Sequence, residues 1–147
     1  MAINASWNPD TYDYYLKRIF QLKPEYETTL LNDFITYKSG LAVPNIFGRD
    51  ELYVDPDSIT NIRMAHIHLA TTQKFKPITS KYYQYERTSD AALVYVRHHF
   101  DENAYSLLAI FPHSAHTYAR DYPFMEELAK YAEKFCKNPV PPKDNQS

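Results

Sequence analysis

The spacing of hydrophobic positions along the chain predicts two helices. In 24–39, and from Pro123 to about residue 137, apolar side chains recur every three or four positions, as on the buried stripe of an amphipathic helix. Pro24 and Pro123 suit a first helical turn, where the N–H that proline lacks would have no partner. Gly40 follows the first segment as a stop signal. The pattern therefore predicts an N-terminal helix and a C-terminal helix.

Runs of β-branched and aromatic residues predict the strands. These runs span 12–22, 63–70, 82–87, 91–100 and 105–111. The run 105–111 is strongly apolar, which predicts a central strand, and the short polar turn before it predicts an antiparallel hairpin with 91–100. The order strand, helix, meander and helix predicts an α+β domain with an antiparallel sheet of about four to five strands.

Proline, glycine and polar residues predict the remaining segments as connections. They are a loose leader at 1–10, a long loop at 41–62, a basic turn at 71–81, a polar connector at 112–121 and a disordered tail at 138–147. Residues 11–137 are then expected to form a single domain, which agrees with a length of 147 residues.

Composition excludes several classes of protein. The chain has two glycines, fewer than a P-loop or a dinucleotide-binding turn requires, and a single cysteine, Cys136, which forms no internal disulfide or multi-cysteine zinc site. No apolar run approaches the roughly 18 residues of a membrane helix. The first five residues lack the basic and apolar regions of a secretory signal. We therefore expect a cytoplasmic protein with no membrane partner.

Charge is distributed unevenly along the chain. The net charge is −2, yet residues 61–100 contain six basic and two acidic residues together with four of the histidines. A positive centre in an otherwise acidic chain indicates a local anion site, or alternatively a chance excess on a solvated face.

The predicted strand 63–70 contains two histidines that are separated by one residue. Strand periodicity assigns Ala65, Ile67 and Leu69 to one face, and His66 and His68 to the other. The apolar set suits a core, so the histidines are expected to point outward. Such a pair also resembles two metal ligands, which would need a third such as His116 or an acid. The alternative is two partly exposed histidines that form hydrogen bonds.

Two further segments contain residues suited to RNA chemistry. Arg87 interrupts the β pattern, where its planar guanidinium suits a phosphate, or an ion pair with Asp90 that tightens a turn. The connector after the apolar strand contains His113, His116, Tyr118 and Arg120. Metal-free RNA cleavage needs a base, an acid and a cation, which histidine and arginine provide. Otherwise the connector is a polar loop whose last residue, Asp121, caps the next helix.

Five segments together resemble the YafO family of bacterial type II toxins. They are IFGRDELY at 46–53, AHIHLA at 65–70, RTSDAALVY at 87–95, FDENAYSLLAI at 100–110 and AHTYAR at 115–120. The resemblance implies a RelE-like fold and a ribosome-dependent mRNA endoribonuclease that a cognate antitoxin holds inactive. It also implies cleavage without a metal or another cofactor.

We take as candidate site residues those in these segments and in the basic turn whose side chains suit RNA cleavage or binding. The catalytic candidates are His66, His68, Arg87, His116 and Arg120, and Asp90 lies in the same motifs. The RNA- or ribosome-binding candidates are Arg49, Lys74, Lys76, Lys81 and Tyr118. The expected partners are the antitoxin, the ribosome and mRNA. Two alternatives are a non-catalytic inhibitor that binds the ribosome or a partner, and a histidine–metal hydrolase.

Strand periodicity also predicts how the catalytic candidates are arranged. His66, His68 and Arg87 are expected on one open face of the sheet, and His116 and Arg120 are expected to reach the same shallow, basic cleft from the connector. Such a cleft suits RNA that the ribosome presents, because few phosphates then need neutralising by the protein itself.

Overall fold

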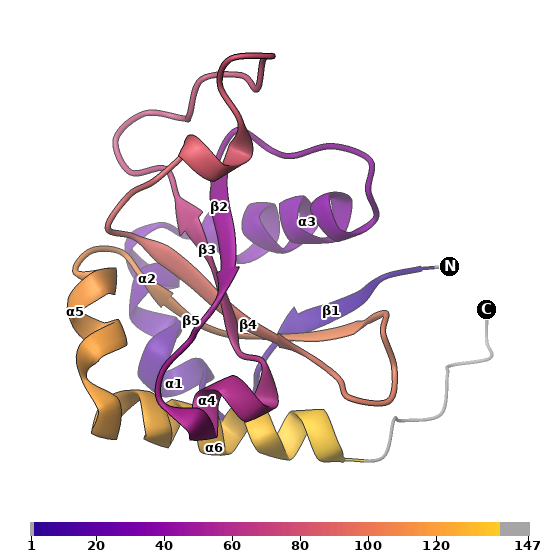
Figure 1. Ribbon diagram of the computed structural model, residues 1–147, viewed down its shortest axis with the longest axis vertical. Helices are drawn as coiled ribbons and strands as arrows, with labels where there is room; N and C mark the ends of the chain where they lie inside the picture. The colour runs from indigo at the N-terminus through magenta and orange to yellow at the C-terminus, as the bar shows by residue number, and fades with distance from the viewer. Residues whose placement is uncertain (1, 139–147) are drawn as a thin grey trace.

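The computed structural model describes residues 2–138, which form a five-stranded sheet with helices on both faces (Figure 1). The strands are β1 (Asn4–Trp7), β2 (Phe47–Leu52), β3 (Ala65–Leu69), β4 (Ala92–Arg97) and β5 (Ala104–Phe111). The helices are α1 (Tyr12–Tyr15), α2 (Lys17–Leu22), α3 (Tyr26–Lys38), α4 (Asp57–Ile62), α5 (Ala115–Arg120) and α6 (Tyr122–Lys137), with a 3₁₀ turn, η1 (Gln84–Glu86).

The strands lie in the order β1-β5-β4-β3-β2. Neighbours from β2 to β5 pair antiparallel, as predicted, whereas β1 pairs parallel with β5. The predicted α+β class is therefore confirmed, and the sheet has five strands in the described chain. The prediction of a purely antiparallel sheet is wrong because of β1. The central strand is β4, with β5 beside it. The N-terminal and C-terminal helices around a meander are broadly consistent with a RelE-like fold.

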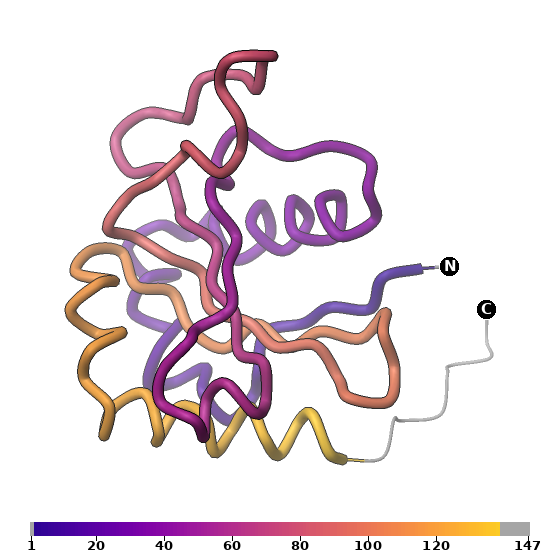
Figure 2. The backbone as a smooth tube through the Cα atoms, viewed as in Figure 1, coloured from indigo at the N-terminus to yellow at the C-terminus, as the bar shows by residue number. Residues whose placement is uncertain are grey.

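Two apolar layers cover the two faces of the sheet. Ile67 and Leu93 pack with α2 and α3 on one face, and Val94 and Leu108 pack with α4 and α6 on the other. Every residue of β5 is buried. A strand buried on both faces needs apolar side chains at every position, which explains the continuous hydrophobic run of β5. Figure 2 shows the α6 segment running along one edge of the molecule.

The N-terminal predictions are wrong in two places. Residues 12–22 form α1 and α2 instead of a strand, and residues 4–7 of the expected loose leader form β1. Leu16 and Phe20, four positions apart, are the buried side chains of the helical segment. That helical spacing outweighs the strand preference of the aromatic residues around it. β1 is held by backbone pairing with β5, which no local pattern reveals.

Two predicted connections contain regular structure. The loop 41–62 includes β2 and α4, and the connector 112–121 includes α5. Residues 82–87, predicted as a strand, contain the turn η1. The predicted helices correspond to α3 and α6, and the strands at 63–70, 91–100 and 105–111 correspond to β3, β4 and β5. Almost all of the predicted disordered tail, 139–147, lies outside the described residues. Within the described chain, no helix combines the length and apolarity needed to cross a membrane.

Candidate active site

The histidines of β3 lie on the predicted side of the strand, but that side is covered. His66 is partly buried and His68 is only 5% exposed. The two rings stack with centroids 5.6 Å apart, and the Tyr53 ring stacks on His66 at 4.2 Å. The expectation of an open face is therefore wrong, because α4, α5 and α6 pack on this face of the sheet.

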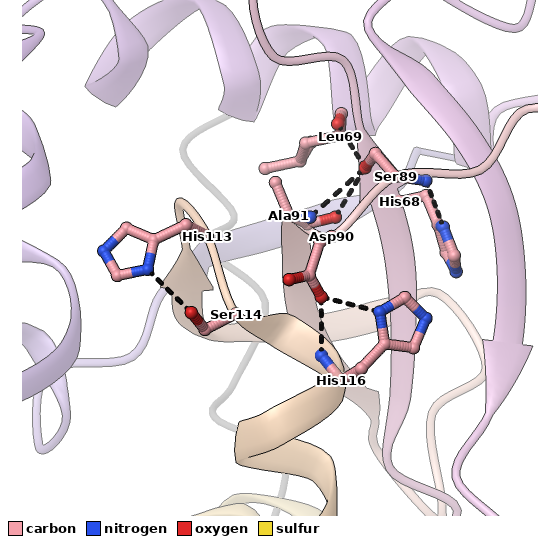
Figure 3. Close-up of polar contacts among 8 residues, drawn as sticks. All are labelled: His68, Leu69, Ser89, Asp90, Ala91, His113, Ser114 and His116. Atoms are coloured by element: carbon pink, nitrogen blue, oxygen red, sulfur yellow. Dashed lines mark hydrogen bonds and ion pairs between the residues drawn. The ribbon is translucent and has the colours of Figure 1, made fainter.

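A backbone contact fixes the protonation pattern of His68. The N–H of Ser89 donates to Nδ1 of His68 at 2.9 Å (Figure 3). A nitrogen that accepts a hydrogen bond must keep its lone pair, so the neutral ring has its proton on Nε2. His68 therefore presents an N–H donor.

Asp90 positions His116 at the start of α5. Its backbone oxygen accepts from the N–H of Ala115, and its Oδ1 accepts from the N–H of His116, both at 2.9 Å. The same Oδ1 lies 2.6 Å from Nδ1 of His116 (Figure 3). These hydrogen bonds hold the pKa of Asp90 below its ordinary value. The ionised carboxylate holds the proton of His116 on Nδ1, which leaves Nε2 as a base.

His66, His68 and His116 line a small cavity, called here the histidine pocket. The rings of His68 and His116 are 6.0 Å apart, and the cavity has a volume of about 30 Å³. Its other lining residues are Tyr53, Ser89, Ala91, Ala92, Ala115 and Ala119. This volume holds about one water molecule, so the pocket is narrower than the predicted shallow cleft.

Burial keeps the imidazoles of β3 uncharged. It lowers the pKa of His66 to about 4, and it lowers the pKa of His68 as well. The neighbouring histidines reinforce both shifts, since a second positive charge nearby is unfavourable. At neutral pH these rings therefore act as neutral hydrogen-bonding groups and contribute no positive charge.

Arg87 does not join the histidine pocket. Its side chain is almost fully buried, and its guanidinium donates to the carbonyl oxygens of Pro44, Phe47 and Lys76 and to Oδ1 of Asn45 at 2.6–3.2 Å. Both interpretations offered for it, an exposed phosphate clamp and an ion pair with Asp90, are wrong on this geometry. Carbonyl oxygens that point into the protein must accept hydrogen bonds there, because water does not reach them. The guanidinium of Arg87 donates these hydrogen bonds.

Two other arginines are better placed. Arg120 is exposed on α5, four residues after His116, so the two side chains share one face of the helix. Arg49 on β2 lies over the Tyr85 ring at 3.7 Å, and its positive charge contributes to the lowered pKa of His68. Arg49 thus acts on His68, and Arg120 lies on the helix that begins beside His116.

The remaining candidates lie away from the histidine pocket. The Tyr118 ring stacks on Phe111, 4.7 Å between centroids, and belongs to the packing around α6. Lys74, Lys76 and Lys81 are exposed on the loop between β3 and η1, which projects beyond the sheet at the top of Figure 1. None of the three lysines lines the histidine pocket.

The sequence reasoning missed Glu51, which stands opposite His66 in the β2–β3 register. One ligand atom each from Glu51, His66 and His68 lies within 4.8 Å of the others, a spacing that could hold a metal ion. However, Nδ1 of His68 already accepts from Ser89, and its other nitrogen is protonated. A protonated nitrogen is not a ligand, so this hydrogen bond disfavours the metal arrangement. Only the pairing of β2 with β3 reveals Glu51.

Comparison with known proteins identifies the family of this chain. Residues 35–137 match the family described as "Toxin YafO, type II toxin-antitoxin system", a class of toxin paired with an antitoxin. The chain is also 43% identical over 119 residues to the "mRNA interferase toxin YafO" of Escherichia coli (strain K12), covering 78% of this chain and 89% of that relative. No solved structure matches. The chain belongs to the YafO toxin family, and the histidine pocket lies within the matched region.

Proposed function

We propose that this toxin is an mRNA endoribonuclease that cleaves on the ribosome, with the histidine pocket as its catalytic site. The observation that carries the proposal is the Asp90–His116 pair, 2.6 Å between Oδ1 and Nδ1, beside the neutral ring of His68. The name of the E. coli relative, an mRNA interferase toxin, supports the same reaction.

The proposed reaction uses the 2′-hydroxyl of the RNA as its nucleophile. Nε2 of His116 removes the proton of the hydroxyl, whose oxygen attacks the adjacent phosphorus. The P–O5′ bond breaks, a 2′,3′-cyclic phosphate forms, and the proton taken from the 2′-hydroxyl ends on the 5′-oxygen. The Nε2–H of His68 donates to a phosphoryl oxygen, and Arg120 and Arg49 offset the charge of the phosphorane.

Charge supports a substrate that the ribosome presents. The chain has a net charge of −2, and the histidine pocket itself contains neutral imidazoles. Such a pocket binds free RNA weakly, because affinity for RNA depends largely on neutralised phosphates. The exposed loop with Lys74, Lys76 and Lys81 offers a further contact for ribosomal RNA. As a type II toxin, the protein has an antitoxin partner.

The test compares His116→Ala with His113→Ala during induced expression. His113 is a matched control because it lies on the same connector, outside the histidine pocket, and its ring forms a hydrogen bond with the hydroxyl of Ser114. Wild type and His113→Ala should arrest growth and leave mRNA cut at discrete positions in primer extension. His116→Ala should leave the mRNA intact. Intact mRNA in cells arrested by the wild type would instead favour a non-catalytic translation inhibitor.

A second test addresses the histidine–metal hydrolase. Purified toxin is assayed on mRNA-programmed ribosomes, with chelator-treated and untreated protein compared at the same magnesium concentration. Because His68 offers no free lone pair, cleavage should be unchanged after chelation. Stoichiometric zinc in the purified protein, together with activity lost on its removal, would overturn the metal-free mechanism.

A further inference from the structure

A second cavity, called here the basic cavity, lies at the other end of β3 from the histidine pocket. Its volume is about 500 Å³, and it opens over Ala65, whereas the histidine pocket contains His68. Ala65, Tyr95 and Tyr105 belong to the apolar layer on the α3 side, so this cavity lies on the opposite face of the sheet. The two sites are therefore separated by the sheet.

Basic groups dominate the lining of this cavity. Lys38, Arg63, Arg97, His98 and His99 all line it, and none of its lining residues is acidic. Asp101 and Glu102 line an adjoining hollow that shares Arg97 and the two histidines, and Asp50 contacts the lining residues Lys38 and Tyr95. The cavity is also large enough for a nucleotide-sized ligand.

Two of these cations have no acidic partner in the described part of the chain. Among residues 2–138, neither Arg63 nor Arg97 forms an ion pair. Burial raises the pKa of Tyr105, and the charge of Arg97 and a hydrogen bond from its side chain oppose that shift, so Arg97 is held against a neutral tyrosine that lines the cavity. Lys38, in contrast, is held by Asp50 at 3.2 Å and by the hydroxyl of Tyr95 at 2.8 Å. Both ring nitrogens of His98 have backbone partners.

The backbone of Arg63 adds an independent observation. Arg63 ends α4 in the left-handed conformation, with φ 60° and ψ 42°. Glycine adopts this conformation without penalty, whereas a residue with a Cβ is strained there. In the described chain the side chain makes no hydrogen bond that would offset this cost. A strained arginine at the mouth of a basic cavity indicates that its guanidinium has a binding role.

We propose that the basic cavity binds a phosphate group of a ribonucleotide, with Arg63 and Arg97 as its principal donors. The planar guanidinium forms paired hydrogen bonds with phosphate oxygens. Two arginines that form no ion pair, in a cavity without a lining acid, therefore suit a phosphate group. This inference deepens the proposed function, because RNA is the substrate there. It does not require cleavage at the histidine pocket.

The test measures binding of a fluorescent single-stranded RNA oligonucleotide to the full chain by anisotropy at several salt concentrations. Arg63→Gly removes the cation and also relieves the backbone strain. This variant should bind RNA several-fold more weakly, with a salt slope reduced by about 1, yet melt at the same temperature or higher. Arg97→Gln should show the same loss of affinity. Arg18→Gln, an exposed arginine on α2 outside the cavity, should bind like the wild type.

Competition distinguishes the sources of the phosphate. Displacement by unlabelled RNA alone would assign the site to an RNA strand, and displacement by a mononucleotide as well would assign it to a free nucleotide. Equal displacement by polyglutamate, or unchanged affinity in both cavity variants, would overturn the proposal. The anisotropy measurement detects binding without cleavage, so a failure of the cleavage mechanism would leave this result intact.

Discussion

A Cβ atom on Gly48 would overlap the carbonyl oxygen of Arg87 and lie 2.9 Å from the Cβ of Arg87. The close approach is held by hydrogen bonding, since the N–H of Arg49 donates to that same carbonyl oxygen at 2.8 Å. It brings η1 onto β2, where the side chain of Gln84 also donates to the carbonyl oxygen of Gly48. The junction fixes the segment that leads to Ser89 and Asp90.

Gly48→Ala should therefore be strongly destabilising. The added methyl group meets backbone, which cannot rotate away, so we expect a loss of about 3 kcal/mol in the free energy of unfolding, measured with urea. Gly40→Ala is the matched control. Gly40 has φ +77° but nothing within 4 Å of an added Cβ, so it should cost only about 1 kcal/mol. Equal losses in the two variants would contradict the close packing at Gly48.

Replacement of Arg87 should reduce stability more than chemistry. Arg87→Gln leaves the inward carbonyl groups of Pro44, Phe47 and Lys76 without their donor, which should cost about 3 kcal/mol in the free energy of unfolding. Arg18→Gln, at an exposed arginine of α2, is the control and should cost less than about 1 kcal/mol. A stable Arg87→Gln protein that has lost cleavage would instead restore the phosphate-clamp interpretation.

Asp90→Asn should separate catalysis from folding. Asparagine keeps an oxygen for the N–H of His116, but it no longer holds the proton of His116 on Nδ1 by charge. The cleavage rate on ribosomes should fall on the order of 10²-fold or more, with the melting temperature close to that of the wild type. Asp13→Asn, an exposed aspartate of α1, serves as the control. Wild-type cleavage by Asp90→Asn would contradict the proposed role of the pair.

Stability should decrease as the pH falls from about 6.5 to about 4. Burial lowers the pKa of His66 from 6.5 to about 4, so the unfolded chain binds this proton more readily than the folded chain in that range. One such proton changes the free energy of unfolding by about 1.4 kcal/mol per pH unit. The stability from this group is fully present above pH 6.5. The groups facing His66 are Tyr53, Glu51, His68 and His116, and the lowered pKa of His68 adds to the slope.

The measurement is urea unfolding at a series of pH values for wild type and His66→Gln. Glutamine does not titrate in this range, so the variant should lose less stability between pH 6.5 and 4 than the wild type. Identical pH dependence in both proteins would show that protonation of His66 does not cause the loss of stability.

Local pattern alone predicted much of the framework. Helical spacing located α3 and α6, because their buried stripes repeat within the segment itself. Strand periodicity correctly assigned His66 and His68 to one face of β3 and Ile67 to the other, since alternate side chains of a strand point to opposite sides. The motif segments also indicated the YafO family. These features depend on residues close together in the sequence.

Tertiary structure decided what surrounds those residues. The parallel pairing of β1 with β5 joins positions about 100 residues apart, and the packing of α5 brings His116 to His68. Arg87 has the right chemistry for phosphate, yet its partners are carbonyl oxygens from two distant loops, so its burial is visible only in the folded chain. Periodicity shows which side chains share a face. Which element then covers that face depends on long-range contacts, and these determined the small histidine pocket.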